Sequence, residues 1–111
     1  MMWLNMIGAA GTAVLGLIGL IFPDRAANLV NLRAFTPAGM SEFRGTYGGL
    51  FMVMGVIPII TRNPGFFAFA GVLWAGIAVG RAISIFADRA GTRANWGALV
   101  FEAVMAFALL A

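Results

Sequence analysis

The sequence predicts an all-α fold: an integral membrane four-helix bundle with a short interfacial helix between its first and second spans. Composition is the first reason, because the 111-residue chain is 62% hydrophobic and only 10% charged. Its mean hydropathy of +0.98 is far above that of soluble domains. Segment length is the second reason, since the apolar runs are too long and too uniform for barrel strands. We expect residues 1–111 to form a single membrane domain.

Four apolar segments match the thickness of a bilayer. They run from about residue 3 to 22, 38 to 60, 66 to 87 and 95 to 111. At about 1.5 Å per residue, each can cross a hydrocarbon core of ~30 Å, and the fourth is only just long enough. The first segment, which begins MMWLNMIG, has no basic residue ahead of it. We therefore expect a retained first helix rather than a signal peptide.

The connections between these segments carry residues that end helices. Pro23 and Asp24 follow the first span, and residues 24–35 then mix leucine and valine with arginine and asparagine. This mixture is typical of a short helix lying at the membrane interface. TRNPG, residues 61–65, predicts a tight turn, and DRAGTRAN, residues 88–95, joins the third and fourth spans.

The arginines predict an orientation. The second connection holds only Arg62, whereas the first and third connections hold Arg25, Arg33, Arg89 and Arg93. Positive charge is enriched in cytoplasmic loops, so the first and third connections should face the cytoplasm and both termini should lie outside it. We expect a multi-pass protein of the bacterial inner membrane.

Four charged residues lie inside the predicted spans, namely Glu42, Arg44, Arg81 and Glu102. Arg44, Arg81 and Glu102 lie about 9–10 Å from the cytoplasmic face, and Glu42 is slightly shallower. An isolated charge at this depth is costly, whereas a paired one need not be. Glu42 and Arg44 are roughly 200° apart around their helix, so each should meet a partner on another helix. The pattern predicts an inter-helix charge cluster, which is either structural or a site for a ligand or proton.

Small residues accompany these charges. Ridges of small residues let membrane helices approach closely, and here they would let the charged side chains reach across. One such ridge on the first helix holds Gly8, Thr12 and Gly16. On the later spans, the predicted helix-packing positions are Gly45, Gly48, Gly49, Gly76, Gly80 and Ser84.

Three sequence elements carry a resemblance to a known family. They are SEFRGTYGGLFMVMG from residue 41, GxxxGR at 76–81 with Asp88 beyond it, and FE at 101–102. Together they resemble small bacterial four-helix membrane proteins known only as a domain of unknown function, similar in outline to DoxX-like proteins. The resemblance covers most of the chain and implies no established activity, although the DoxX comparison suggests redox or quinone chemistry. The signature positions that it implies are Glu42, Arg44, Tyr47, Gly48, Gly49, Gly80, Arg81 and Glu102.

Residue types restrict the chemistry. The chain has no histidine and no cysteine, which removes the usual ligands of haem, zinc and copper, so we predict no metal site. Acid–base work by Glu42 or Glu102 is conceivable, but two arginines at similar depth favour ion pairs. No catalytic residue is assigned, and a non-catalytic protein is favoured over an enzyme. The arginines form no contiguous patch, so nucleic acid is not an expected partner.

Three functions are compatible with this sequence. The first is an accessory or scaffold subunit, packed against a larger membrane complex or in a homo-oligomer. The second is a binding protein for an amphiphile, a quinone or a lipid, held by Arg44, Arg81 and Tyr47. The third is a small transporter or proton-conducting element. We favour the first, expect no obligatory cofactor, and expect membrane lipids as partners.

Overall fold

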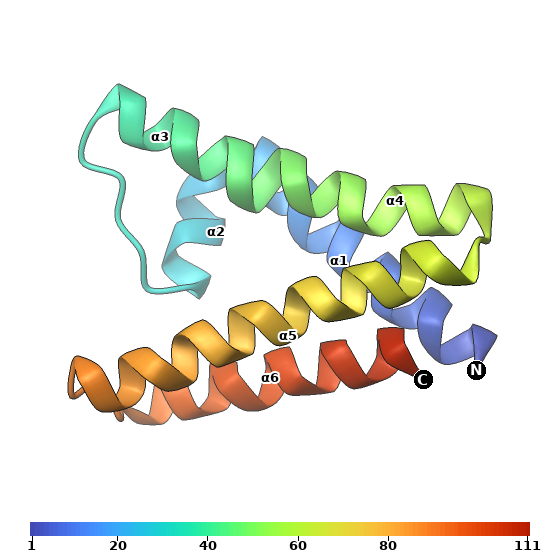
Figure 1. Ribbon diagram of the computed structural model, residues 1–111. Helices are drawn as coiled ribbons and strands as arrows, with labels where there is room; N and C mark the ends of the chain where they lie inside the picture. Colours follow the sequence, from blue (N-terminus) through green and yellow to red (C-terminus); the bar gives the residue numbers. More distant parts are fainter. The chain divides into compact units, whose positions relative to one another are not determined.

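A computed structural model describes residues 1–111, and it contains helices and connections with no strand. Figure 1 labels the α-helices in chain order: α1 (Met2–Ile21), α2 (Pro23–Leu29), α3 (Pro37–Phe43), α4 (Phe51–Thr61), α5 (Pro64–Ala87) and α6 (Arg93–Leu110). A π-helix, η1 (Arg44–Leu50), lies between α3 and α4. The elements α3, η1 and α4 form one continuous helix of 25 residues. This helix, α1, α5 and α6 are the four that are long and apolar enough to cross a membrane. The predicted all-α fold, with a short helix between the first two spans, is confirmed.

Local sequence signals explain where the helices begin. Proline at the first helical position needs no hydrogen-bond partner for its nitrogen, and Pro37 and Pro64 occupy that position in α3 and α5. Thr92 precedes α6, and its hydroxyl accepts a hydrogen bond from the Asn95 nitrogen at 3.2 Å. Because the cap at Thr92 lets Arg93 and Ala94 join the helix, α6 begins at Arg93, two residues before the expected start at residue 95.

The π-helix η1 was not expected, because the second span reads as an uninterrupted α-helix. Its sequence is RGTYGGL. Three glycines in seven residues lower the barrier to leaving α-helical geometry, since glycine has no Cβ to restrict the backbone. π-helical segments are rare and are often found at functional sites.

The chain divides into two compact units, each of which is described by itself. The first consists of residues 1–8 and 63–111. In this unit α5 and α6 lie side by side (Figure 1). If Gly71 of α5 carried a Cβ atom, that atom would lie only 2.7 Å from the Leu110 side chain of α6, so the two helices are in close contact there. The amide of Asn5 donates hydrogen bonds to the carbonyl oxygens of Ala108 at 2.8 Å and Leu109 at 3.1 Å. The start of α1 is thereby fixed to the end of α6.

The second unit consists of residues 9–62. Here α1 packs directly against the backbone of the second span. The glycines at the contact have no side chain that would separate the two helices. A Cβ on Gly19 would overlap with the Tyr47 carbonyl, and one on Gly16 would overlap with the Met52 nitrogen. The predicted small-residue ridge of the first helix thus contacts η1 and α4 at Gly16.

Large apolar side chains remain on the outside of the spans. Between 22% and 33% of the residues in each candidate span are buried. Ile83 of α5 is 63% exposed and Phe107 of α6 is 68% exposed. A monomeric soluble protein rarely exposes so much contiguous apolar surface, whereas lipid covers it at no cost. These features are those of a small multi-pass membrane protein.

Candidate functional site

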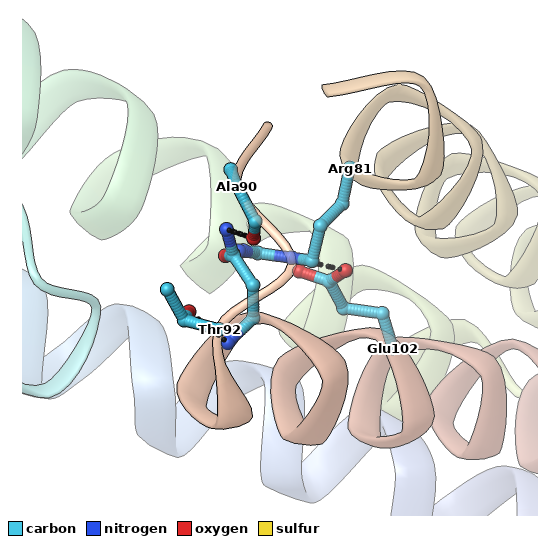
Figure 2. A network of polar contacts seen from close by, with 5 residues as sticks. Arg81, Ala90, Thr92 and Glu102 are labelled. Atoms are coloured by element: carbon cyan, nitrogen blue, oxygen red, sulfur yellow. Dashed lines mark hydrogen bonds and ion pairs between the residues drawn. The ribbon is translucent and has the colours of Figure 1, made fainter. Parts of the chain in front are cut away.

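An ion pair joins α5 to α6 inside the membrane-length segments. The Nε of Arg81 donates a hydrogen bond to Oε1 of Glu102 at 2.8 Å (Figure 2). The Glu102 side chain is 6% exposed and that of Arg81 is 27% exposed. The matching depths of these two residues predicted that they would meet. A charge-assisted contact this short stabilises both charges in an environment that would strongly disfavour either one alone.

Asn95 extends the ion pair to the turn between the two helices. Its Oδ1 accepts a hydrogen bond from Nη1 of Arg81 at 2.6 Å, and its Nδ2 donates to the Ala90 carbonyl oxygen at 2.8 Å. Figure 2 shows this network running from Glu102 through Arg81 to the backbone near Thr92. The guanidinium therefore holds two acceptors from α6 with two of its nitrogens. We refer to Arg81, Asn95, Glu102 and the Ala90 carbonyl as the hairpin clasp.

Asn95 was missed as a site residue, because it was treated as the boundary of the fourth span. A usable signal was present: Asn95 and Glu102 are seven residues apart, which places them on one face of a helix. Ser84, a predicted helix-packing residue, makes a hydrogen bond at the end of its own helix, and its packing role stays a prediction. Its hydroxyl donates to Oδ2 of Asp88 at 2.6 Å, so it acts in the last turn of its own helix.

Glu42 and Arg44 belong to the second unit and make different contacts. Nη1 of Arg44 donates a hydrogen bond to the Leu20 carbonyl oxygen at 2.9 Å, at the end of α1. A cation at a helix C-terminus satisfies a carbonyl that has no partner in its own helix. Glu42 is exposed on α3. The structure thus brings Arg81 and Glu102 together, and a single cluster of all four charges stays a prediction.

Glu42 faces a hollow of about 430 Å³ in the second unit. The hollow lies between the connection at residues 32–36 and the elements α3 and η1. Tyr47 of the predicted site also lines it, with its ring stacked on Phe43 at 4.8 Å between centroids. The other polar side chains of the lining are Arg33, Thr36 and Thr46. Arg33 was used in the sequence only to orient the chain, and no pattern there marked it as a site residue.

The predicted helix-packing glycines divide into two groups. At Gly48 the helices do approach closely, because an added Cβ would lie 2.8 Å from the Leu20 side chain. A Cβ at Gly45, Gly76 or Gly80 would meet no atom within 4 Å. Within its own unit, none of these three glycines has a second helix against it, and their role in helix packing stays a prediction.

The reason is the rotational position of each glycine. The buried face of α5 carries Phe67, Gly71, Trp74 and Ile85, and Gly76 and Gly80 are exposed on another side of that helix. Gly49 also makes no contact with a second helix, since the one atom near its added Cβ is the Arg44 oxygen, 4.0 Å away.

Comparison with known proteins gives one match. A family model described as "Domain of unknown function (DUF4345)" matches residues 1–111. No curated protein and no solved structure matches the chain. The family match agrees with the resemblance to a membrane family of unknown function, and it carries no link to DoxX-like proteins.

Proposed function

We propose that this chain, which belongs to the DUF4345 family of unknown function over residues 1–111, is a non-catalytic accessory or scaffold subunit. It would dock through α5 against a helix of a larger membrane complex or of a second copy. The observation that carries the proposal is a stripe of exposed residues on α5, which we call the α5 outer face. It consists of Val72, Gly76, Val79, Gly80 and Ile83.

The α5 outer face has the features of a helix-packing surface in lipid. Successive residues of the stripe are three or four positions apart, except for the adjacent Val79 and Gly80, so all five lie on one side of the helix. An added Cβ at Gly76 or Gly80 would meet no atom within 4 Å, so the helix surface there is open to an approaching side chain. Val79 and Ile83 beside these glycines are β-branched and lose little rotamer freedom on packing. Helix association in membranes depends on this close van der Waals fit at small residues.

The hairpin clasp supports the same proposal. Arg81 follows Gly80 directly, and its ion pair with Glu102 fixes α5 against α6. Because these charges have partners inside the chain, a docking helix need not supply one. The α5 outer face can therefore be covered by an entirely apolar helix.

Larger side chains on the α5 outer face test the proposal. An added Cβ at Gly76 or Gly80 meets no atom within 4 Å, so Gly76→Ile and Gly80→Ile extend a branched side chain outward from open positions. Each should reduce, by about tenfold or more, the recovery of partner chains or second copies from native membranes in mild detergent. Ala103→Ile is the matched control, since Ala103 is an exposed small residue on α6. Unchanged recovery with both glycine variants would contradict docking through α5.

Amphiphile binding is a second candidate function, and the hollow beside Tyr47 is the observation that favours it. Arg44 and Arg81, the arginines first expected to hold a quinone or a lipid, hydrogen-bond to groups of the chain. The charged side chains that line this hollow are instead Arg33 and Glu42.

We further propose a bacterial inner-membrane location with both termini outside the cytoplasm. The arginines at residues 22–36 (Arg25 and Arg33) and at residues 88–95 (Arg89 and Arg93) support this orientation. A reporter fused after Ala111 should behave as periplasmic. A cytoplasmic signal from that fusion would reverse the orientation.

A further inference from the structure

We propose that the hollow beside Tyr47 binds the headgroup of a zwitterionic aminophospholipid, with the phosphate at Arg33 and the primary ammonium at Glu42. The proposal stands apart from docking through α5, because it uses residues of the other unit. The volume of the hollow, about 430 Å³, is in the range of small-ligand sites. The hollow is open, as a site for a lipid that remains in the bilayer must be.

The charges of the hollow suit a zwitterion. Arg33 and Glu42 are its two charged residues, so their formal charges sum to zero. A guanidinium binds phosphate oxygens through paired hydrogen bonds, and a carboxylate accepts hydrogen bonds from an ammonium group. An anionic headgroup would be attracted by Arg33 but repelled by the carboxylate of Glu42. A headgroup carrying both charges can satisfy both residues.

Two hydroxyls add donors for the phosphate. Thr36 Oγ1 accepts a hydrogen bond from the Gly39 nitrogen at 2.9 Å, which leaves its hydroxyl hydrogen for another acceptor. Thr46 is exposed in η1 and also lines the hollow. Phosphate oxygens accept several hydrogen bonds at once, so these donors complement Arg33.

The aromatic rings favour a primary over a quaternary ammonium. Quaternary ammonium groups are typically held against open aromatic faces. In this hollow one face of Phe35 is covered by the Arg33 guanidinium, 5.5 Å from the ring centroid, and Tyr47 is stacked on Phe43. The remaining partner for a cation is the Glu42 carboxylate, which favours a group able to donate hydrogen bonds.

The surroundings of the hollow favour a lipid over a soluble zwitterion. The connection that forms its rim exposes apolar side chains, with Phe35 83% exposed and Leu32 45% exposed. Arginine stacked beside exposed apolar groups is typical of segments at the headgroup layer. The hollow also adjoins the start of the second span, where Glu42 lies only about 8 Å along the helix from Pro37. Acyl chains can therefore extend along the span while the headgroup occupies the hollow.

Lipid retention by the intact chain tests the proposal. The protein is exchanged into detergent with equal amounts of phosphatidylethanolamine, phosphatidylglycerol and phosphatidylcholine of identical acyl chains, and retained lipid is counted by native mass spectrometry. Wild type should retain phosphatidylethanolamine about tenfold better than the other two, because each charged hydrogen bond contributes strongly. Glu42→Gln should abolish the preference over phosphatidylglycerol, and Arg33→Gln should lower the retention of phosphatidylethanolamine and of phosphatidylglycerol. Asp24→Asn and Arg62→Gln are charge-matched controls outside the hollow.

The outcomes separate clearly. Equal retention of the three lipids by wild type would overturn the proposal, and this comparison requires no variant to fold. Preferential retention of phosphatidylglycerol would also overturn it, because the hollow would then select an anion. So would an equal loss of preference in the control variants.

Discussion

The two units of the chain differ in the most prominent contact between their helices. In the α5–α6 hairpin, long polar side chains reach across, with Arg81 contacting Glu102 and Asn95. In the unit of residues 9–62, backbone meets backbone at Gly16, Gly19 and Gly55 of α1 and the second span. Glycine-rich packing excludes side chains from the contact, whereas the hairpin clasp depends on them.

This difference shows that one motif can have two roles. Glycines spaced by three or four residues occur in both units, but those of α1 face another helix and Gly76 and Gly80 face outward. A small-residue motif therefore marks a helix-packing surface without identifying the helix that covers it. The three experiments below separate the two roles.

The largest effect should come from Gly55→Ala. Its new Cβ would overlap with the Ala13 nitrogen and the Ala9 carbonyl, both backbone atoms of α1 that cannot move aside alone. We expect the free energy of unfolding to fall by about 2–3 kcal/mol, despite the better helix propensity of alanine. Unfolding in detergent, followed by circular dichroism, measures this value. Wild-type stability in the variant would show that glycine contacts do not hold this unit.

An intermediate effect should come from the clasp. Arg81→Ala, Glu102→Ala and the double variant form a thermodynamic cycle, for which we expect a coupling free energy of roughly 1–2 kcal/mol. Each single change leaves the other charge without its partner in a low dielectric, so the double variant should be less destabilised than the sum. Strict additivity would mean that the ion pair contributes no specific stability. Glu102 would then be reconsidered as a ligand or proton site.

The smallest effect, with the opposite sign, should come from Gly76→Ala. The added Cβ meets nothing within 4 Å, so the gain in helix propensity of about 0.5–1 kcal/mol should appear as increased stability of the isolated chain. The same detergent unfolding assay measures it. Destabilisation would place Gly76 against another helix and would contradict an open α5 outer face.

Sequence reasoning located the spans well because their ends carry strong local signals. Pro37 and Pro64 start helices, and Arg62 ends one with a left-handed backbone (φ 52°). The partnership of Arg81 with Glu102 followed from depth, since neighbouring antiparallel helices bring equal depths together.

The role of Arg44 did not follow, for a physical reason. Depth specifies a position along the helix axis but not the direction around it, and the π-helix that begins at Arg44 alters that direction. The open position of Gly76 and Gly80 was not predicted for a similar reason. The spacing of small residues in the sequence defines a stripe on the helix, but it does not identify which helix packs against that stripe. The hollow involves Arg33, whose position depends on an irregular connection that no periodic pattern describes.

The hairpin clasp also determines how α5 and α6 respond to membrane voltage. A transmembrane field acts on a single charge with a free energy of about 2.3 kcal/mol per 100 mV for a full crossing. Arg81 and Glu102 carry opposite charges and lie in direct contact at 2.8 Å, so the field exerts nearly cancelling forces on them. The pair therefore places two opposite charges within a span while adding almost no net charge on which a change in membrane potential could act.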